Sequence, residues 1–270
     1  MALAQTTNVL ERIAAAGYSG SWQGAKALLL QGYNGAVTTS AETVWDESTA
    51  YTFLTAAMSS PYVASSSTND VLTSGTGAWS VRIYGVNTSF AEFTEDKNLN
   101  GQTSVVLTTT SVLAINKVEV LTVGSGGANA GVIRVGTGTN TAGVPAVVHA
   151  HVAVGTNLSR HGFYVVPANR TLLIRDLVFA SGSATAGAIT ADITQAIDLT
   201  GVVKKVFTQM GTNNDAIKPP LIMPLVFAAK SKLNFQITSS AGTGPASLFA
   251  NSILLDTRNT TDATSFANWI

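Results

Sequence analysis

The feature that most limits how this chain can fold is a loop that occurs twice between apolar, strand-like segments. The two copies are Ser125-Gly-Gly-Ala-Asn-Ala-Gly131 and Ser181-Gly-Ser-Ala-Thr-Ala-Gly187. Small residues and glycine suit tight turns, and the flanking runs are rich in the β-branched residues that favour strands. The repeat predicts two β-turn-β units. Neither loop ends in the Gly-Lys-Ser/Thr of a phosphate-binding loop, so a turn is the better interpretation.

Short apolar segments continue through most of the sequence after residue 66. In Trp79-Ser-Val-Arg-Ile-Tyr84 the residues Trp79, Val81 and Ile83 fall on one face, which is the period of a half-buried strand. Further strands are expected at residues 112–123, 132–135, 147–154, 171–179, 188–193, 202–207, 233–237 and 248–255. This spacing predicts an all-β chain with two β-sandwich, jelly-roll-like domains.

We predict four regions along the chain. An irregular, partly helical N-terminal arm spans residues 1–66, a first β domain 67–146, a second β-sandwich or jelly-roll-like domain 147–257, and a C-terminal tail 258–270. Within the arm, Asn8 is a suitable cap for a short helix to Ala16. The apolar segments 22–30 and 51–58 are further short helical or extended pieces.

The arm and the tail carry large apolar side chains that need a surface to cover them. We regard eight of them as candidate assembly contacts: Trp22, Tyr33, Trp45, Tyr51, Phe53, Phe266, Trp269 and Ile270. Aromatic side chains bury a large area per residue and suit such docking. The alternative is that the aromatic residues of the arm cover the core of the same chain.

Charge is scarce and balanced. Of the 270 residues only 11% are charged, against about 25% in an average soluble chain, and the formal net charge is zero. A chain without a basic run is a poor non-specific binder of nucleic acid, which requires several cations on one face. There is no cysteine, no secretory leader pattern and no apolar run of about 18 residues. We therefore expect synthesis in a cytoplasm and no membrane or nucleic-acid partner.

The search for reactive groups gives two weak candidates. His149 and His151 point to one face of a predicted strand, where three copies around a threefold axis could cage a metal, but we favour the simpler interpretation that they are polar side chains on a solvent face. Glu92, Glu95 and Asp96 form the densest carboxylate group and are expected in a solvated turn. No Gly-x-Ser-x-Gly elbow occurs. We predict no enzymatic activity, no catalytic residue, and no bound metal or cofactor.

Six turn and strand motifs lie between residues 65 and 140: Ser65-Ser-Ser-Thr-Asn-Asp70, Gly75-Thr-Gly-Ala78, Val81-Arg-Ile-Tyr-Gly85, Leu99-Asn-Gly-Gln-Thr103, Ile115-Asn116 and Ser125-Gly-Gly-Ala-Asn-Ala-Gly131. Together they resemble a module of virion structural proteins of tailed bacteriophages, marine ones in particular. Residues 163–255, through Val165-Val-Pro-Ala-Asn-Arg-Thr-Leu172 and the apolar strand 252–255, resemble the jelly-roll-like domains of phage decoration, head-fibre and tail proteins.

The resemblance implies a non-enzymatic virion protein that is assembled in the host cytoplasm. We expect a capsid decoration or cement subunit whose partners are other virion proteins and copies of itself, and we hypothesise a trimer. The alternative is a tail or head-fibre adhesin that presents the glycine-rich loops to a receptor. A glycan-degrading enzyme of the same β-rich class would need a carboxylate cluster that the sequence does not display.

Overall fold

A computed structural model describes residues 24–182, 187–199, 201–212, 214–221, 223–241 and 243–257. The described chain is all-β, every strand pairing is antiparallel, and no helix occurs in these ranges. No described segment is therefore a helix long and apolar enough to cross a membrane. The strands are β1 Ala25–Val37, β2 Glu42–Thr43, β3 Tyr62–Ser65, β4 Ala78–Asn87, β5 Glu92–Asn98, β6 Val105–Val106, β7 Val112–Val123, β8 Ile133–Thr141, β9 Val144–Val152, β10 Phe163–Val165, β11 Arg170–Ser181, β12 Ala188–Ile197, β13 Val203–Thr212, β14 Ala216–Ile217, β15 Leu225–Phe227, β16 Ser231–Ser239 and β17 Gly244–Asp256.

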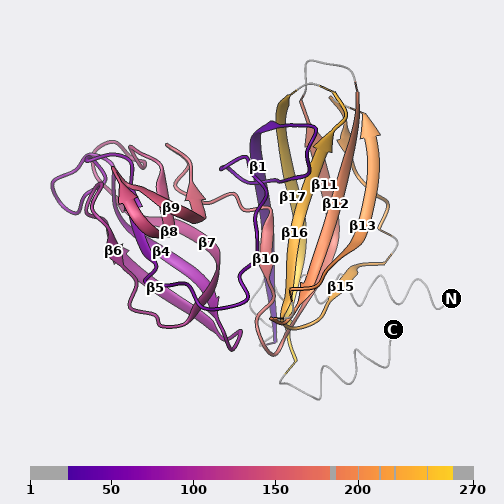
Figure 1. Cartoon of the computed structure of the whole chain (residues 1–270), viewed down its shortest axis with the longest axis horizontal. Helices are drawn as coiled ribbons and strands as arrows, with labels where there is room; N and C mark the ends of the chain where they lie inside the picture. Colours follow the sequence, from indigo (N-terminus) through magenta and orange to yellow (C-terminus); the bar gives the residue numbers. More distant parts are fainter. Residues whose placement is uncertain are drawn as a thin grey trace.

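The strands form four sheets that are grouped into two lobes (Figure 1). The first lobe contains the sheets β6-β3-β8-β9 and β5-β4-β7. The second lobe contains β1-β17-β11-β14, with β15 beside β11, and β10-β16-β12-β13, with β2 beside β16. The first lobe is thus an insertion in the second, because β1 and β2 precede it and β10 to β17 follow it.

Each lobe encloses its own apolar core between its two sheets. The core of the second lobe contains side chains from both of its sheets, such as Leu172 and Ile174 of β11 and Phe235 and Ile237 of β16. In the first lobe Val81 and Ile83 of β4 face the sheet that contains Ile133. The alternation predicted for β4 is confirmed at these two positions, whereas Trp79 lies beside a register shift and is only partly buried.

The predicted helical character of the arm is wrong wherever the structure describes it. Residues 25–37 form β1, which pairs with β17 along almost its whole length, from Ala25 opposite Leu255 to Val37 opposite Gly244. Residues 51–58 have no regular structure. A run such as Ala-Leu-Leu-Leu suits a helix or a strand by composition alone, and the long-range pairing with β17 decides the outcome. The predicted helix at 8–16 lies outside the described residues.

The repeated loops connect strands of facing sheets. The first joins β7 to β8, and the second joins β11 to β12. In each pair the two strands belong to different sheets of one lobe, so neither connection is a hairpin between neighbouring strands. Residues 183–186 of the second loop are outside the described ranges. The predicted strand-loop-strand order is confirmed, and the connection crosses from sheet to sheet.

The close approach of β1 to the connection after β2 gives a first prediction. A Cβ at Gly32 would lie 2.2 Å from the backbone oxygen of Val44, whereas a Cβ at Gly35 on the same strand would meet only Tyr33 at an ordinary 3.7 Å. Gly32→Ala should therefore lower the free energy of unfolding by about 1–3 kcal/mol through overpacking. Gly35→Ala is the matched control and should leave it unchanged or slightly raised. Equal effects in urea titrations of the two variants would contradict the close approach.

Candidate functional site

The two lobes meet at a cluster of five rings, which we call the aromatic cluster: Trp45, Tyr51, Phe53, His161 and Phe163. Phe163 is at its centre, stacked on Tyr51 with 3.7 Å between ring centroids and on His161 with 4.7 Å. Trp45 meets Phe163 edge-on at 5.5 Å. Edge-to-face and stacked pairs add about 0.5–1.5 kcal/mol each beyond the buried area. The cluster fixes the connection after β2 against β10.

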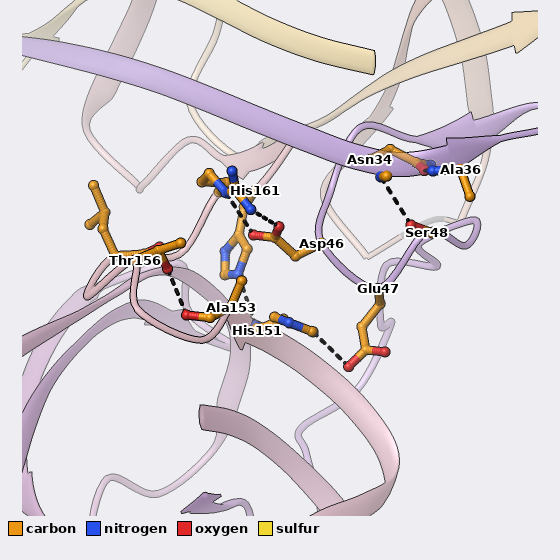
Figure 2. A network of polar contacts seen from close by, with 12 residues as sticks. Asn34, Ala36, Asp46, Glu47, Ser48, His151, Ala153, Thr156 and His161 are labelled. Atoms are coloured by element: carbon orange, nitrogen blue, oxygen red, sulfur yellow. Dashed lines mark hydrogen bonds and ion pairs between the residues drawn. The ribbon is translucent and has the colours of Figure 1, made fainter. Parts of the chain in front are cut away.

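A polar network lies next to the aromatic cluster and joins the lobes (Figure 2). Glu47, on the connection after β2, accepts hydrogen bonds from Arg134 Nε of β8 at 2.6 Å and from His151 Nδ1 of β9 at 2.8 Å. The backbone N–H of His151 donates to His161 Nε2 at 3.2 Å. A neutral His161 therefore carries its proton on Nδ1. These bonds connect the aromatic cluster to β8 and β9 of the first lobe.

Burial controls the protonation of this network. It lowers the pKa of His149 to about 4 and that of His161 to about 3, because a charged imidazole would lose its hydration. For Glu47 burial acts in the opposite direction, but the hydrogen bonds from His151 and Arg134 prevail and lower the pKa to about 2. At neutral pH His149 and His161 are therefore neutral and Glu47 is ionised.

A second set of contacts closes the junction on the other side of β10. The side-chain amide of Asn116 on β7 acts as a short strand: it donates to Val165 O and accepts from Val165 N, both at 2.9 Å. Lys232 Nζ donates to Leu54 O at 2.9 Å, and burial lowers the pKa of this lysine. The backbone oxygen of Phe90 accepts from Ala168 N at 2.7 Å. The lobes are therefore fastened by hydrogen bonds as well as by apolar contact.

The motifs that carry the resemblance converge on the carboxylate of Asp70, which is fully buried. Its Oδ1 accepts from Ala78 N at 2.6 Å and from Ala130 N at 2.8 Å, and its Oδ2 accepts from Gly131 N at 2.8 Å and from Ser65 Oγ at 2.5 Å. Four donors on one carboxylate replace its lost hydration. We call this arrangement the Asp70 knot.

Glycines make room for the Asp70 knot. A Cβ at Gly77 would lie 2.1 Å from Asp70 Oδ1, and a Cβ at Gly131 would lie 2.7 Å from Ser65 Oγ. Asn129 anchors the same loop by donating to Gly131 O and Ala153 O. The base of the repeated loop is therefore fixed, while Ser125, Gly126 and Gly127 at its tip are exposed. Sequence patterns placed these motifs on turns but gave no sign that one carboxylate gathers them.

The structure places four of the eight candidate assembly contacts. Trp45 and Tyr51 are buried in the aromatic cluster, Phe53 is partly buried there, and Tyr33 lies under the guanidinium of Arg160 at 4.3 Å. For Trp45 and Tyr51 this is the intramolecular alternative. The other four lie outside the described residues: Trp22, Phe266, Trp269 and Ile270.

The two histidines and one of the three carboxylates are buried to an extent that the sequence did not indicate, whereas Glu92 and Asp96 are exposed. His149 and His151 are 3% and 6% exposed, so the solvent-facing interpretation is wrong. Glu95 lies on β5, not in a solvated turn, and accepts hydrogen bonds from Thr108 and Thr109, which with Lys97 lower its pKa to about 2 despite its partial burial. Within the described ranges no three His, Asp or Glu side chains gather as a metal site would require.

Several residues of the junction were not predicted from the sequence. Asp46 and Glu47 are separated from their partners Arg160 and Arg134 by more than eighty residues, so no local spacing connects them. Burial raises the pKa of Asp46, although its hydrogen-bonded pair with Arg160 opposes the rise. Asn116, Val165 and Ala168 belong to motifs of the resemblance, but the sequence did not connect them across the lobes.

We compared the chain with protein families, curated proteins and solved structures. No family model and no curated protein matches the chain. Among solved structures, PirA is 11% identical over 33% of this chain and 90% of its own, with a TM-score of 0.21. Two structures of infectious bursal disease virus each match over 87% of this chain. The structure of the Gt strain is 12% identical over 69% of its own chain, with a TM-score of 0.20. The VP2 subviral particle is 11% identical over 71% of its own chain, with a TM-score of 0.21. TM-scores this low carry no argument about fold or function.

The buried imidazoles make the junction sensitive to acid. The unfolded chain protonates histidine below a pH of about 6.5, whereas folded His149 and His161 stay neutral down to about 4 and 3. Their contribution to stability is complete above pH 6.5 and is lost as the pH falls toward those values. Between pH 7.5 and 5 the free energy of unfolding should fall by about 2 kcal/mol for each of the two histidines.

Urea titrations at the two pH values measure this loss, and the variant His149→Asn should show about half of it. A free energy of unfolding that is equal at pH 7.5 and pH 5 would show that the two imidazoles are not held neutral.

The Asp70 knot gives a prediction about shape and charge. Asp70→Asn keeps the volume but points an NH₂ group at backbone donors, so it should lower the free energy of unfolding by about 3 kcal/mol or more. Asp96→Asn is the matched control, because Asp96 is half exposed and pairs with Arg82 on the surface. That change should cost about 0–1 kcal/mol. Thermal melting of both variants tests the knot, and similar melting temperatures would refute it.

Proposed function

We propose that this chain is a non-enzymatic structural protein of a virion, a subunit that decorates or cements the head of a tailed bacteriophage. In this proposal the two lobes serve as the two β-sandwich, jelly-roll-like domains that the sequence predicts. The mechanism is mechanical: surfaces buried between subunits offset the entropy lost when the subunits are ordered. The protein is assembled into the particle in the host cytoplasm.

The observation that carries the proposal is the use of the resembling motifs. Asp70, Ser65 and Gly131 all take part in the hydrogen bonds of the Asp70 knot. The side-chain amide of Asn116 is likewise hydrogen-bonded to the backbone of Val165. The motifs resemble a virion module, and their polar groups form hydrogen bonds that hold loops and lobes together. This use of the polar groups supports a structural role.

The charge distribution supports the same role. Most of the carboxylates and cations that the structure describes are engaged in ion pairs, such as Arg82 with Asp96 and Arg170 with Glu92 and Asp256. With a formal net charge of zero, neighbouring copies would not repel each other at close packing. We propose that the partners are other virion proteins and further copies of the chain, with a trimer as the form hypothesised from the sequence.

The exposed tip of the loop at residues 125–131 favours one alternative, a tail or head-fibre adhesin that presents this loop to a receptor. The two functions differ in copy number. A decoration subunit covers the head and is present in hundreds of copies, whereas an adhesin is present in the few copies of the tail symmetry.

Quantitative mass spectrometry of purified virions measures that number against the major capsid protein. We expect a count in the hundreds. A count in the range of tail proteins would replace decoration by the adhesin, and absence from the virion would refute both. Release of reducing ends from host polysaccharide by the purified chain, with a known depolymerase in parallel, would refute the non-enzymatic role.

A further inference from the structure

The strand β13 forms the open edge of the second lobe, on the side away from the first lobe (Figure 1). Its ten residues pair with β12 on one side only. Among the described residues no strand pairing or backbone hydrogen bond engages its other side. An edge of this length presents a row of backbone donors and acceptors to any strand that can lie beside it.

The side chains of this edge are apolar where they are most exposed. Met210, at 67%, is the most exposed large apolar side chain of the described residues, and Val203 and Val206 are 62% and 42% exposed. The pairing with β12 shifts register near Val206, so residues 207–212 form an uninterrupted run. That run, Phe-Thr-Gln-Met-Gly-Thr, has no charge and no proline.

Several other edges of the same chain carry features that disfavour pairing with a further strand. The edge strand β5 has four charged residues among its seven, β9 contains Pro145, and β6, β14 and β15 have only two or three residues. On β1 a register shift between Asn34 and Val37 bends the strand. On β13 the only charges are Lys204 and Lys205, before the run, and Lys205 is paired with Asp192 at 2.7 Å.

We propose that β13 pairs with β13 of a second copy of this chain, antiparallel across a local two-fold axis, to form a continuous sheet between two subunits. The strand is complementary to itself. With the axis at Thr208, Lys205 lies opposite Gly211 and Lys204 opposite Thr212. With the axis at residue 209 or 210, the lysines fall beyond the run. In none of these registers do like charges meet, and the uncharged residues pair with one another.

This contact is a property of the isolated chain, and it deepens the proposed function by naming one surface through which copies associate. In a trimer it would link one trimer to the next. The experiments use purified chain without virions, so their failure would remove the β13 contact and leave the copy number in the particle to decide between decoration and adhesin.

Single cysteines test the geometry, because the chain has none of its own. Residues that face each other in an antiparallel pair have Cβ atoms about 4.5–5.5 Å apart. One of the variants Thr208→Cys, Gln209→Cys and Met210→Cys should therefore form a disulfide-linked dimer under mild oxidation. Val106→Cys, an exposed position on the first lobe, is the control. Cross-linking of all three variants no faster than this control would overturn the proposal.

A charge placed on the edge tests the energetics. Met210→Lys should weaken self-association at least about tenfold in sedimentation velocity, because it places a charge within the uncharged run that forms the contact. Val106→Lys adds the same charge to a side chain that is 56% exposed and should leave association unchanged. Unchanged melting temperatures show that both variants fold. A parent chain that sediments as a monomer up to about 100 µM, or an equal effect of both variants, would overturn the proposal.

Discussion

The pairing of β1 with β17 is the interaction on which the rest of the architecture depends. It joins residues 25–37 to residues 244–256, so the sheet of the second lobe contains both ends of the described chain. The first lobe is inserted between β2 and β10, so the chain must leave the second lobe after β2 and come back to it at β10. Because this closure brings together residues more than two hundred positions apart, we expect it to form late in folding.

The junction is the consequence of that insertion. Two connections have to cross between the lobes, and the aromatic cluster packs one against the other: Trp45 and Tyr51 come from the connection before the first lobe, and His161 comes from the connection after it. Glu47 lies on the first of these connections and binds Arg134 of β8 and His151 of β9 in the first lobe. At Phe90 the backbone is held at a φ of +59°, a strained value for a bulky residue, while its oxygen receives the N–H of Ala168. Ring stacking, hydrogen bonds and partly buried ion pairs hold the two lobes in one orientation, and they offset the strain at Phe90.

The sequence was sufficient for what depends on neighbouring residues. The strand predicted at residues 112–123 coincides with β7, and that at 171–179 lies within β11, because a short run of apolar, β-branched residues is visible locally. What depends on distant partners could not be obtained in this way. The run at residues 25–30 becomes a strand because β17 is beside it, and His151 is bonded to Glu47 and His161, which come from connections far away in the sequence. The candidate assembly contacts show the same limit, since Trp45 and Tyr51 are apolar anchors whose partner is the chain itself.

The repeated loop takes a different meaning in this architecture. A hairpin would join neighbouring strands of one sheet, and its sequence would be selected mainly for turn geometry. An arch between facing sheets must also cover the open end of a core. In the first copy Asp70 and Asn129 hold the base of the arch from below, so the backbone polar groups of the loop are satisfied without a neighbouring strand. Such an arch leaves the strand edges to be protected by other means, and in this nearly uncharged chain only some of them are. β5 is protected by its four charged residues, and the uncharged run of β13 is left as the edge where a second subunit can continue the sheet.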